Sequence, residues 1–131
     1  MDAKTLHWPG GEHRFLLRIG ELRALQRNCD AGPEEIFNRL RFGKWRVDDI
    51  IEPIRLGLIG SGEMTTDEAG PFVALRMQQH PPVQFKLTAL AIMSHSLMGD
   101  PDDVVGEPEA GEAEKMSPES GASPAITATA P

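Results

Sequence analysis

Two histidines near the N-terminus are the first residues whose types and spacing could do chemistry. His7 and His13 lie symmetrically about Gly10, so a tight hairpin would place their imidazoles opposite each other. Two imidazoles can bind a metal ion, but zinc sites need three or four protein ligands, and no Cys or carboxylate lies at a suitable spacing. We therefore interpret both as surface histidines and predict no metal site.

The nucleophilic side chains are equally isolated. Cys29 lies at a predicted helix end without a nearby His, and no serine stands in a G-x-S-x-G turn. The glycines of GLIGSG, residues 57–62, follow a predicted helix rather than a strand and lack the Lys of a phosphate loop, so we interpret them as a helix end and turn. We predict no catalytic residue, no cofactor and no enzymatic activity.

A basic cluster between two predicted helices has the residue types of a DNA-binding surface. Its arrangement loosely resembles a helix-turn-helix, but four carboxylates flank it and cancel its field. Cations also favour helix C-termini for reasons unrelated to DNA. DNA binding therefore stays the less favoured alternative. The basic residues are Arg39, Arg41, Lys44 and Arg46, and the flanking acidic residues are Glu34, Glu35, Asp48 and Asp49.

A β-hairpin is the first element that the sequence predicts. Its strands, Thr5–Trp8 and Glu12–Ile19, flank a Pro-Gly-Gly group that favours a turn. Within the second strand, Phe15, Leu17 and Ile19 alternate with other side chains at the period of a half-buried strand. These three residues are therefore predicted to face the core.

Apolar residues at helical spacing follow the hairpin, and the last helix is apolar nearly all round, which predicts a place at the centre of the core. The chain is therefore predicted to have an α+β fold, in which an N-terminal β-hairpin packs with four to five short α-helices. The predicted helices run from Glu21 to Cys29, from Pro33 to before Gly43, from a cap at Asp48 or Asp49 to Leu58 with a kink or short break near Asp49 to Pro53, from Thr66 or Pro71 to the Pro81–Pro82 pair, and from Val83 to Met98, where Gly99 ends the last helix.

Charge divides the chain into two parts. Residues 1–99 carry 12 acidic and 12 basic side chains, whereas residues 100–131 carry 8 acidic side chains and Lys115. The second part also holds five of the eleven prolines and no aromatic residue, so it cannot bury enough apolar surface to offset the entropy of ordering it. We predict a folded body at 1–99 and a disordered acidic Pro/Ala/Ser-rich tail at 100–131. The neutral body makes nucleic acid an unfavoured partner.

The cysteine content and the apolar segments predict a cytoplasmic protein that does not span a membrane. A single cysteine cannot form an internal disulfide, which fits a reducing compartment. The start, MDAKTLHWPGG, has no apolar segment long enough for a secretory signal. The longest apolar stretch, Leu87–Met93, falls short of the ~18 residues that a spanning helix needs.

The order of these pieces resembles the gene transfer agent family of small phage-tail proteins. The matching pieces are the strand that leads directly into a helix (Phe15–Leu25), the short helix with its basic turn (Ile36–Arg46), the apolar helix that ends in GLIGSG, and a Thr-Asp-Glu helix start (Thr66–Glu68). The resemblance covers about Phe15 to Met98. Pro53, Pro71 and the acidic tail depart from the pattern.

The resemblance implies a non-enzymatic role in tail morphogenesis. Members are named either as tail tube proteins or as tail assembly chaperones, and the resemblance implies binding to the tape-measure protein and recruitment of tail tube subunits. A tube subunit needs several long strands to form a continuous β-lined ring, but only one hairpin is visible here, so we favour the chaperone. We predict partner contacts at Trp8 and Leu16, as exposed apolar groups that the hairpin cannot bury, and at Trp45 beside the basic turn, because aromatic residues anchor interfaces. Packing on the body is the alternative for each Trp.

Overall fold

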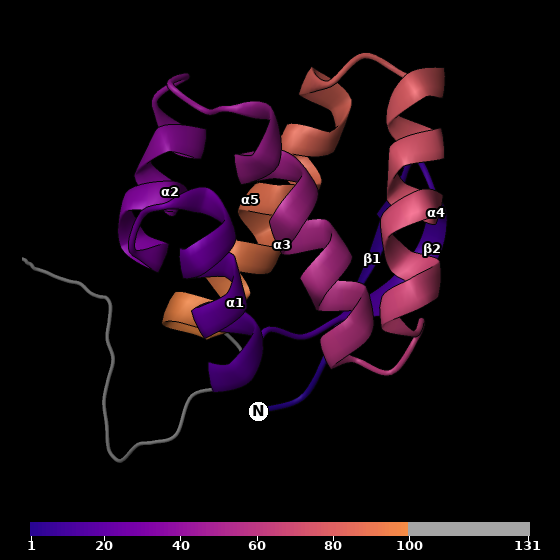
Figure 1. Cartoon of the computed structure of the whole chain (residues 1–131), viewed down its shortest axis with the longest axis horizontal. Helices are drawn as coiled ribbons and strands as arrows, with labels where there is room; N and C mark the ends of the chain where they lie inside the picture. The colour runs from indigo at the N-terminus through magenta and orange to yellow at the C-terminus, as the bar shows by residue number, and fades with distance from the viewer. Residues whose placement is uncertain (100–131) are drawn as a thin grey trace, which may run out of the picture. The chain divides into compact units, whose positions relative to one another are not determined.

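The computed structural model describes residues 1–99 as one antiparallel hairpin followed by five helices, which confirms the predicted α+β fold (Figure 1). The predicted acidic tail, residues 100–131, lies outside the described residues. The elements are β1 Lys4–Trp8, β2 Gly11–Phe15, α1 Ile19–Cys29, α2 Pro33–Arg41, α3 Val47–Gly60, α4 Thr66–Gln79 and α5 Val83–Met98.

The hairpin differs from the prediction at its second strand. β2 ends at Phe15, because the N–H of Leu16 donates to the carbonyl of Gly57 in α3 (3.0 Å) instead of continuing the ladder. Phe15 and Leu17 are buried as predicted. Ile19 is 63% exposed and begins α1, so the prediction that it lies on the inner face is wrong.

The strand register also separates the two histidines. Position 7 pairs with Glu12, and position 13 pairs with Leu6, so the imidazoles do not lie opposite each other as predicted. His7 Nε2 lies 3.7 Å from a carboxylate oxygen of Glu12. Among residues 1–99, no group of three or more His, Cys, Asp or Glu side chains could hold a metal ion.

Helices α1 and α2 end and begin at the residues that their sequence signals favour. α1 ends where Asp30 takes the left-handed conformation (φ 52°), which leaves Pro33 to open α2 with the fixed φ of its ring. Glu34 and Glu35 stand in the first turn of α2, where carboxylates interact favourably with the helix dipole. Gly43, at φ 73°, then lets the chain turn toward α3.

Helix α3 is continuous through Pro53, so of the predicted kink or short break, the break is wrong. The ring removes one backbone hydrogen bond. Packing on β2, α1, α2, α4 and α5 surrounds the helix and compensates for this loss. The N-cap also differs from the prediction, because it is Arg46 rather than Asp48 or Asp49. The backbone N–H of Arg46 donates to Oδ2 of Asp49, which lies in the first turn of the helix (2.8 Å).

Helix α4 begins at Thr66, and the alternative start at Pro71 is wrong. Thr65 and Glu68 form a reciprocal capping box: the Thr65 hydroxyl accepts from the Glu68 N–H (3.3 Å), and Glu68 Oε1 accepts from the Thr65 N–H (2.9 Å). This box fixes the helix start five residues before the proline.

Helix α5 has the predicted bounds and lies against α3, α2 and β1, so its inner side belongs to the core (Figure 1). Within residues 1–99, no helix is long and apolar enough to cross a membrane. The core consists of buried side chains from the hairpin, the segment between β2 and α1, and all five helices: Trp8, Phe15, Leu17, Leu25, Cys29, Ile36, Leu40, Ile50, Ile54, Leu56, Leu58, Ala69, Val73, Phe85, Ala89, Ile92 and Met93.

Candidate partner interface

One side of α5 presents apolar side chains to solvent along the whole helix. Leu87 is 71% exposed, Met98 64% and Val83 58%. Partly buried residues at helical spacing fill the positions between them. No charged residue belongs to this surface, which we name the α5 face and define as Val83, Leu87, Leu90, Ala91, Ser94 and Met98.

The opposite side of α5 is firmly anchored. Phe85 and Ile92 are buried in the core. His95 Nε2 lies 2.7 Å from the carbonyl oxygen of Asp2, and the Ser96 hydroxyl donates to the carbonyl of Leu17 (3.0 Å). The exposure of the α5 face therefore does not come from loose packing of the helix.

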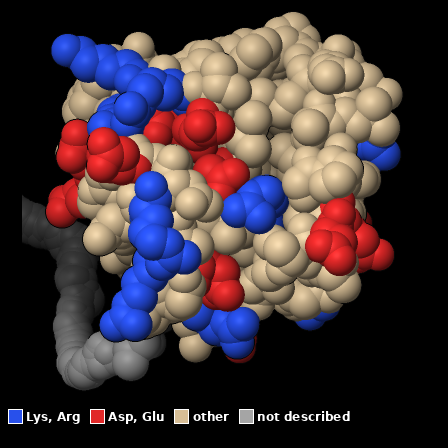
Figure 2. All heavy atoms as spheres, in the orientation of Figure 1, with Lys and Arg blue, Asp and Glu red and all other residues tan. Residues whose placement is uncertain are grey.

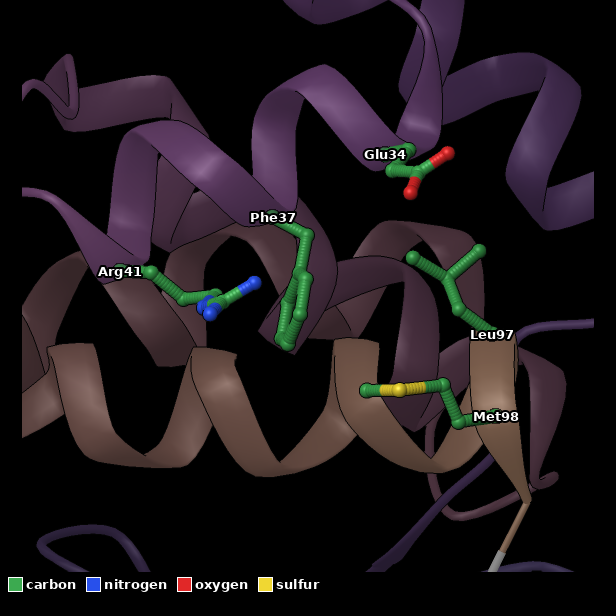
Figure 3. Close-up of a pocket in the computed structure, with 5 residues that line it drawn as sticks. All are labelled: Glu34, Phe37, Arg41, Leu97 and Met98. Carbon is green, nitrogen blue, oxygen red and sulfur yellow. The ribbon is translucent and has the colours of Figure 1, made fainter.

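A groove of about 230 Å³ adjoins the C-terminal end of the α5 face (Figure 3). The ring of Phe37 points from α2 toward α5, and the side chains of Leu97 and Met98 form the other wall. Glu34 lies near Leu97, whereas Arg41 lies farther back along the helix. The groove thus has an apolar middle and opposite charges at its two ends.

Arg41 is held between aromatic rings at the edge of this groove. Its guanidinium carbon lies 5.4 Å from the centroid of Phe37 and 5.0 Å from that of Phe42, which is the range of cation–π contact. Phe42 is 64% exposed in the turn between α2 and α3. This turn therefore adds an aromatic and basic edge to the groove.

Two arginines of the basic cluster that suggested DNA binding form hydrogen bonds with other parts of the body. Arg39 Nη1 donates to Asp49 Oδ1 (3.3 Å), and Arg46 Nη2 donates to the backbone carbonyl of Cys29 (2.7 Å). Basic and acidic side chains also lie side by side over the half of the molecule that holds α1 and α2 (Figure 2). This arrangement weakens the positive field that phosphate binding needs.

The structure places the three predicted contact residues on three separate segments. Trp8 on β1 is 8% exposed, and its indole N–H donates to His13 Nδ1 (2.9 Å). The expectation that the hairpin leaves it exposed is wrong, because the rings of Phe72 and Phe85 close over it from α4 and α5.

The other two predicted contacts keep part of their surface. Leu16 follows β2 and is half-buried, with its backbone bonded to α3. Trp45, in the turn before α3, is half-buried against the core. A partner-binding role for Trp8, Leu16 and Trp45 stays a prediction.

The one cysteine has the properties of a structural residue. Cys29 is 3% exposed, and burial, together with the negative charges of Asp49, Glu52 and Asp48, raises the pKa of its thiol to about 12. Because the thiolate is the reactive form, the thiol is unreactive near neutral pH.

A buried carboxylate joins α1 to α3. Glu52 accepts from Asn28 Nδ2 (2.7 Å) and from Arg55 Nη2 (2.7 Å). Burial acts to raise the pKa of this carboxyl, but the hydrogen bonds from Arg55 and Asn28 outweigh it and hold the pKa below its usual value. The cluster is a structural link within the core.

A small α+β body with an uncovered apolar helix face and an adjoining groove is typical of proteins that bind other proteins. The chain belongs to the family described as phage tail tube protein, GTA-gp10, which matches residues 3–99. This family is non-enzymatic and is also classed among the tail assembly chaperones. The match confirms the phage-tail family predicted from the sequence. No curated protein and no solved structure matches the chain.

Sequence reasoning missed the α5 face although it delimited α5 correctly. A helix that is apolar all round was expected to lie at the centre of the core. The sequence did contain one relevant signal, the small number of elements available for packing. A hairpin and three further short helices cannot surround both α3 and α5. Val83, Leu87 and Met98 are left exposed as a result.

Proposed function

We propose that this chain is a cytoplasmic tail assembly chaperone that binds the tape-measure protein before tail tube subunits are recruited. The observation that carries the proposal is the α5 face. An uncharged apolar strip with three side chains that are more than half exposed is unusual on a protein that functions as a monomer without a binding partner. The family resemblance implies a tape-measure partner whose apolar helical segments would aggregate unless such a surface covered them until assembly.

The small amount of β-structure supports a chaperone over a tube subunit. Residues 1–99 hold one sheet of two five-residue strands, whereas a ring lined by a continuous sheet needs longer strands from every subunit. The hairpin is also covered by α3 and α5. A helical body of this kind suits a protein that binds a helix.

Co-expression with the tape-measure protein of the same tail gene cluster tests this function. We expect the two proteins to co-purify, with more tape-measure protein in the soluble fraction than when it is expressed alone. Absence of co-purification at both low and moderate salt would contradict the proposal.

A structural tube protein is the second candidate, favoured by the family description itself. In that case the purified chain forms rings or tubes visible by electron microscopy, and it is present in finished particles. The chaperone proposal predicts neither.

DNA binding is the third candidate, and the internal bonds of Arg39 and Arg46 count against it. A mobility shift that weakens steeply with salt would support it.

Among the predicted contact residues, we propose Trp45 and Leu16 as further contacts with the partner, because part of each side chain remains accessible. Trp8 would need the hairpin to move before it could contact a partner.

A further inference from the structure

We infer that the α5 face, together with the groove beside Phe37, is the docking site for one amphipathic helix of the partner, and that this helix carries carboxylates beside its apolar residues. The inference rests on the proposed function and names the surface and the partner chemistry that the function leaves open.

The length and spacing of the α5 face fit a helix of about four turns. A helix of 16 residues, the length of α5, is about 24 Å long. On α5, the exposed residues Val83 and Leu87 are four positions apart, and Met98 lies three helical turns after Leu87. A docked helix needs apolar anchors at i, i+3 or i+4, i+7 and i+11 to cover such a strip.

The charges along the edge of the α5 face determine the chemistry of the docked helix. Lys86 neighbours Val83 and Leu90 at i−3 and i+4 on α5, and it is half-buried. Arg41 borders the groove from α2. Neither cation forms an ion pair within residues 1–99. Carboxylates on the docked helix would neutralise both cations while the apolar anchors are buried.

The opposite end of the groove sets the direction of the docked helix. Glu34 lies near Leu97, at the C-terminal end of α5, and it too forms no ion pair among the described residues (Figure 3). We therefore expect the carboxylates of the partner helix at the end that meets Arg41 and Lys86, and neutral or basic residues at the end that meets Glu34.

A second copy of this chain fits the α5 face less well than such a helix. The sequence of α5 is VQFKLTALAIMSHSLM, which contains Lys86 and His95 but no Asp or Glu. Two α5 faces in contact would match apolar strip to apolar strip, but neither helix would supply a carboxylate to the Lys86 of the other. Charge complementarity therefore favours a different, acidic helix.

A matched pair of leucine variants tests the docking site in the full-length protein. Leu87→Glu places a charge in the middle of the α5 face, and Leu75→Glu places the same charge on α4, where Leu75 is 50% exposed. With the tagged tape-measure protein as the probe, we expect Leu87→Glu to weaken binding by about tenfold or more, and Leu75→Glu to bind like the wild type. Equal urea midpoints for the two variants would show that both fold.

A second pair tests the charge of the docked helix. Lys86→Glu should weaken binding to the same probe about three- to tenfold at low salt, and the loss should shrink as salt is raised. Lys86→Arg keeps the cation and should bind like the wild type. Equal binding by both Lys86 variants would overturn the prediction of an acidic helix.

Three outcomes are distinguishable in these experiments. If the wild type does not bind the tape-measure protein at all, the proposed function fails. If the wild type binds and Leu87→Glu binds equally well, the function stands and the docking site on α5 is overturned. If the wild type alone is a dimer by light scattering and Leu87→Glu is a monomer, a second copy covers the face and the inference is overturned.

Discussion

Helices α3 and α5 are the two most apolar helices of the body, yet they differ in what surrounds them. α3 packs against β2, α1, α2, α4 and α5, and its one large apolar side chain that is more than half exposed is Val47, in its first turn. α5 packs against α3, α2 and β1, and exposes apolar residues from its first turn to its last. Two similarly apolar sequences therefore produce a central core helix in one case and a candidate interface in the other.

The comparison teaches that the hydropathy of a helix does not determine its burial when the domain is small. A body of about 100 residues can surround one helix, and the second apolar helix remains covered on one side only.

Truncation of a core residue of α3 should have the largest effect. Ile54 is fully buried, so Ile54→Ala should lower the free energy of unfolding by about 2 to 5 kcal/mol. The matched variant Leu87→Ala on α5 should change it by less than about 0.5 kcal/mol, because Leu87 is 71% exposed. Urea unfolding measures both. Similar losses for the two variants would show that the α5 face is covered in the free protein.

A glycine of α3 should be the next most sensitive position. A Cβ on Gly60 would lie 2.0 Å from the backbone oxygen of Leu16, and neither segment can move without loss of packing. Gly60→Ala should therefore cost about 1 to 3 kcal/mol. Gly20, in the first turn of α1, has no atom within 4 Å of such a Cβ, and Gly20→Ala should leave stability unchanged or raise it by up to about 1 kcal/mol. A tolerated Gly60→Ala would contradict the close contact between α3 and residue 16.

The buried carboxylate of α3 should make the stability of the body depend on pH. Because the pKa of Glu52 is lower in the folded state than in the unfolded state, its contribution is present above the unfolded pKa and is lost as pH falls through the folded pKa. Glu52→Gln should cost about 1 to 2 kcal/mol at neutral pH and reduce the loss of stability below pH 4.5. Thermal unfolding from pH 3 to pH 7 measures this difference. An unchanged pH profile in the variant would exclude Glu52 as its source.

Removal of the residues after α5 should have the smallest effect. A chain that ends at Gly99 retains every core residue identified within residues 1–99, so its free energy of unfolding should lie within about 0.5 kcal/mol of the full-length value. Urea unfolding of the two chains makes the comparison. A larger loss would mean that residues 100–131 contribute to the stability of the body.

Local signals predicted much of the fold. The Pro33 start of α2 and the Gly99 end of α5 depend on residues adjacent to each boundary, and the structure confirms both. The errors at Ile19 and Pro53 have a different cause. Leu16 leaves the hairpin to bond Gly57, 41 positions away in the chain, and Pro53 is tolerated because five other elements pack on its helix. Neither contact is visible in a local pattern.

The candidate interface was harder to predict than the fold. Trp8 was proposed as a contact on its residue type and its expected exposure on the hairpin, yet it is buried under α4 and α5. The exposure of Leu87 depends on which side of α5 the chain leaves uncovered, and this is a property of the assembled helices. The sequence predicted that α5 is apolar, but it did not predict which side of the helix is exposed to solvent.

The accessibility of residue 87 in the complex tests the docking site most directly. Leu87→Cys places a thiol at the centre of the α5 face, whereas the native Cys29 is buried with its pKa raised to about 12, so maleimide at neutral pH should label only the new thiol. We predict rapid labelling of the free full-length protein, strong protection when the tape-measure protein is bound, and no protection of the control Leu75→Cys on α4. Equal labelling of the Leu87→Cys variant with and without bound tape-measure protein would contradict the account.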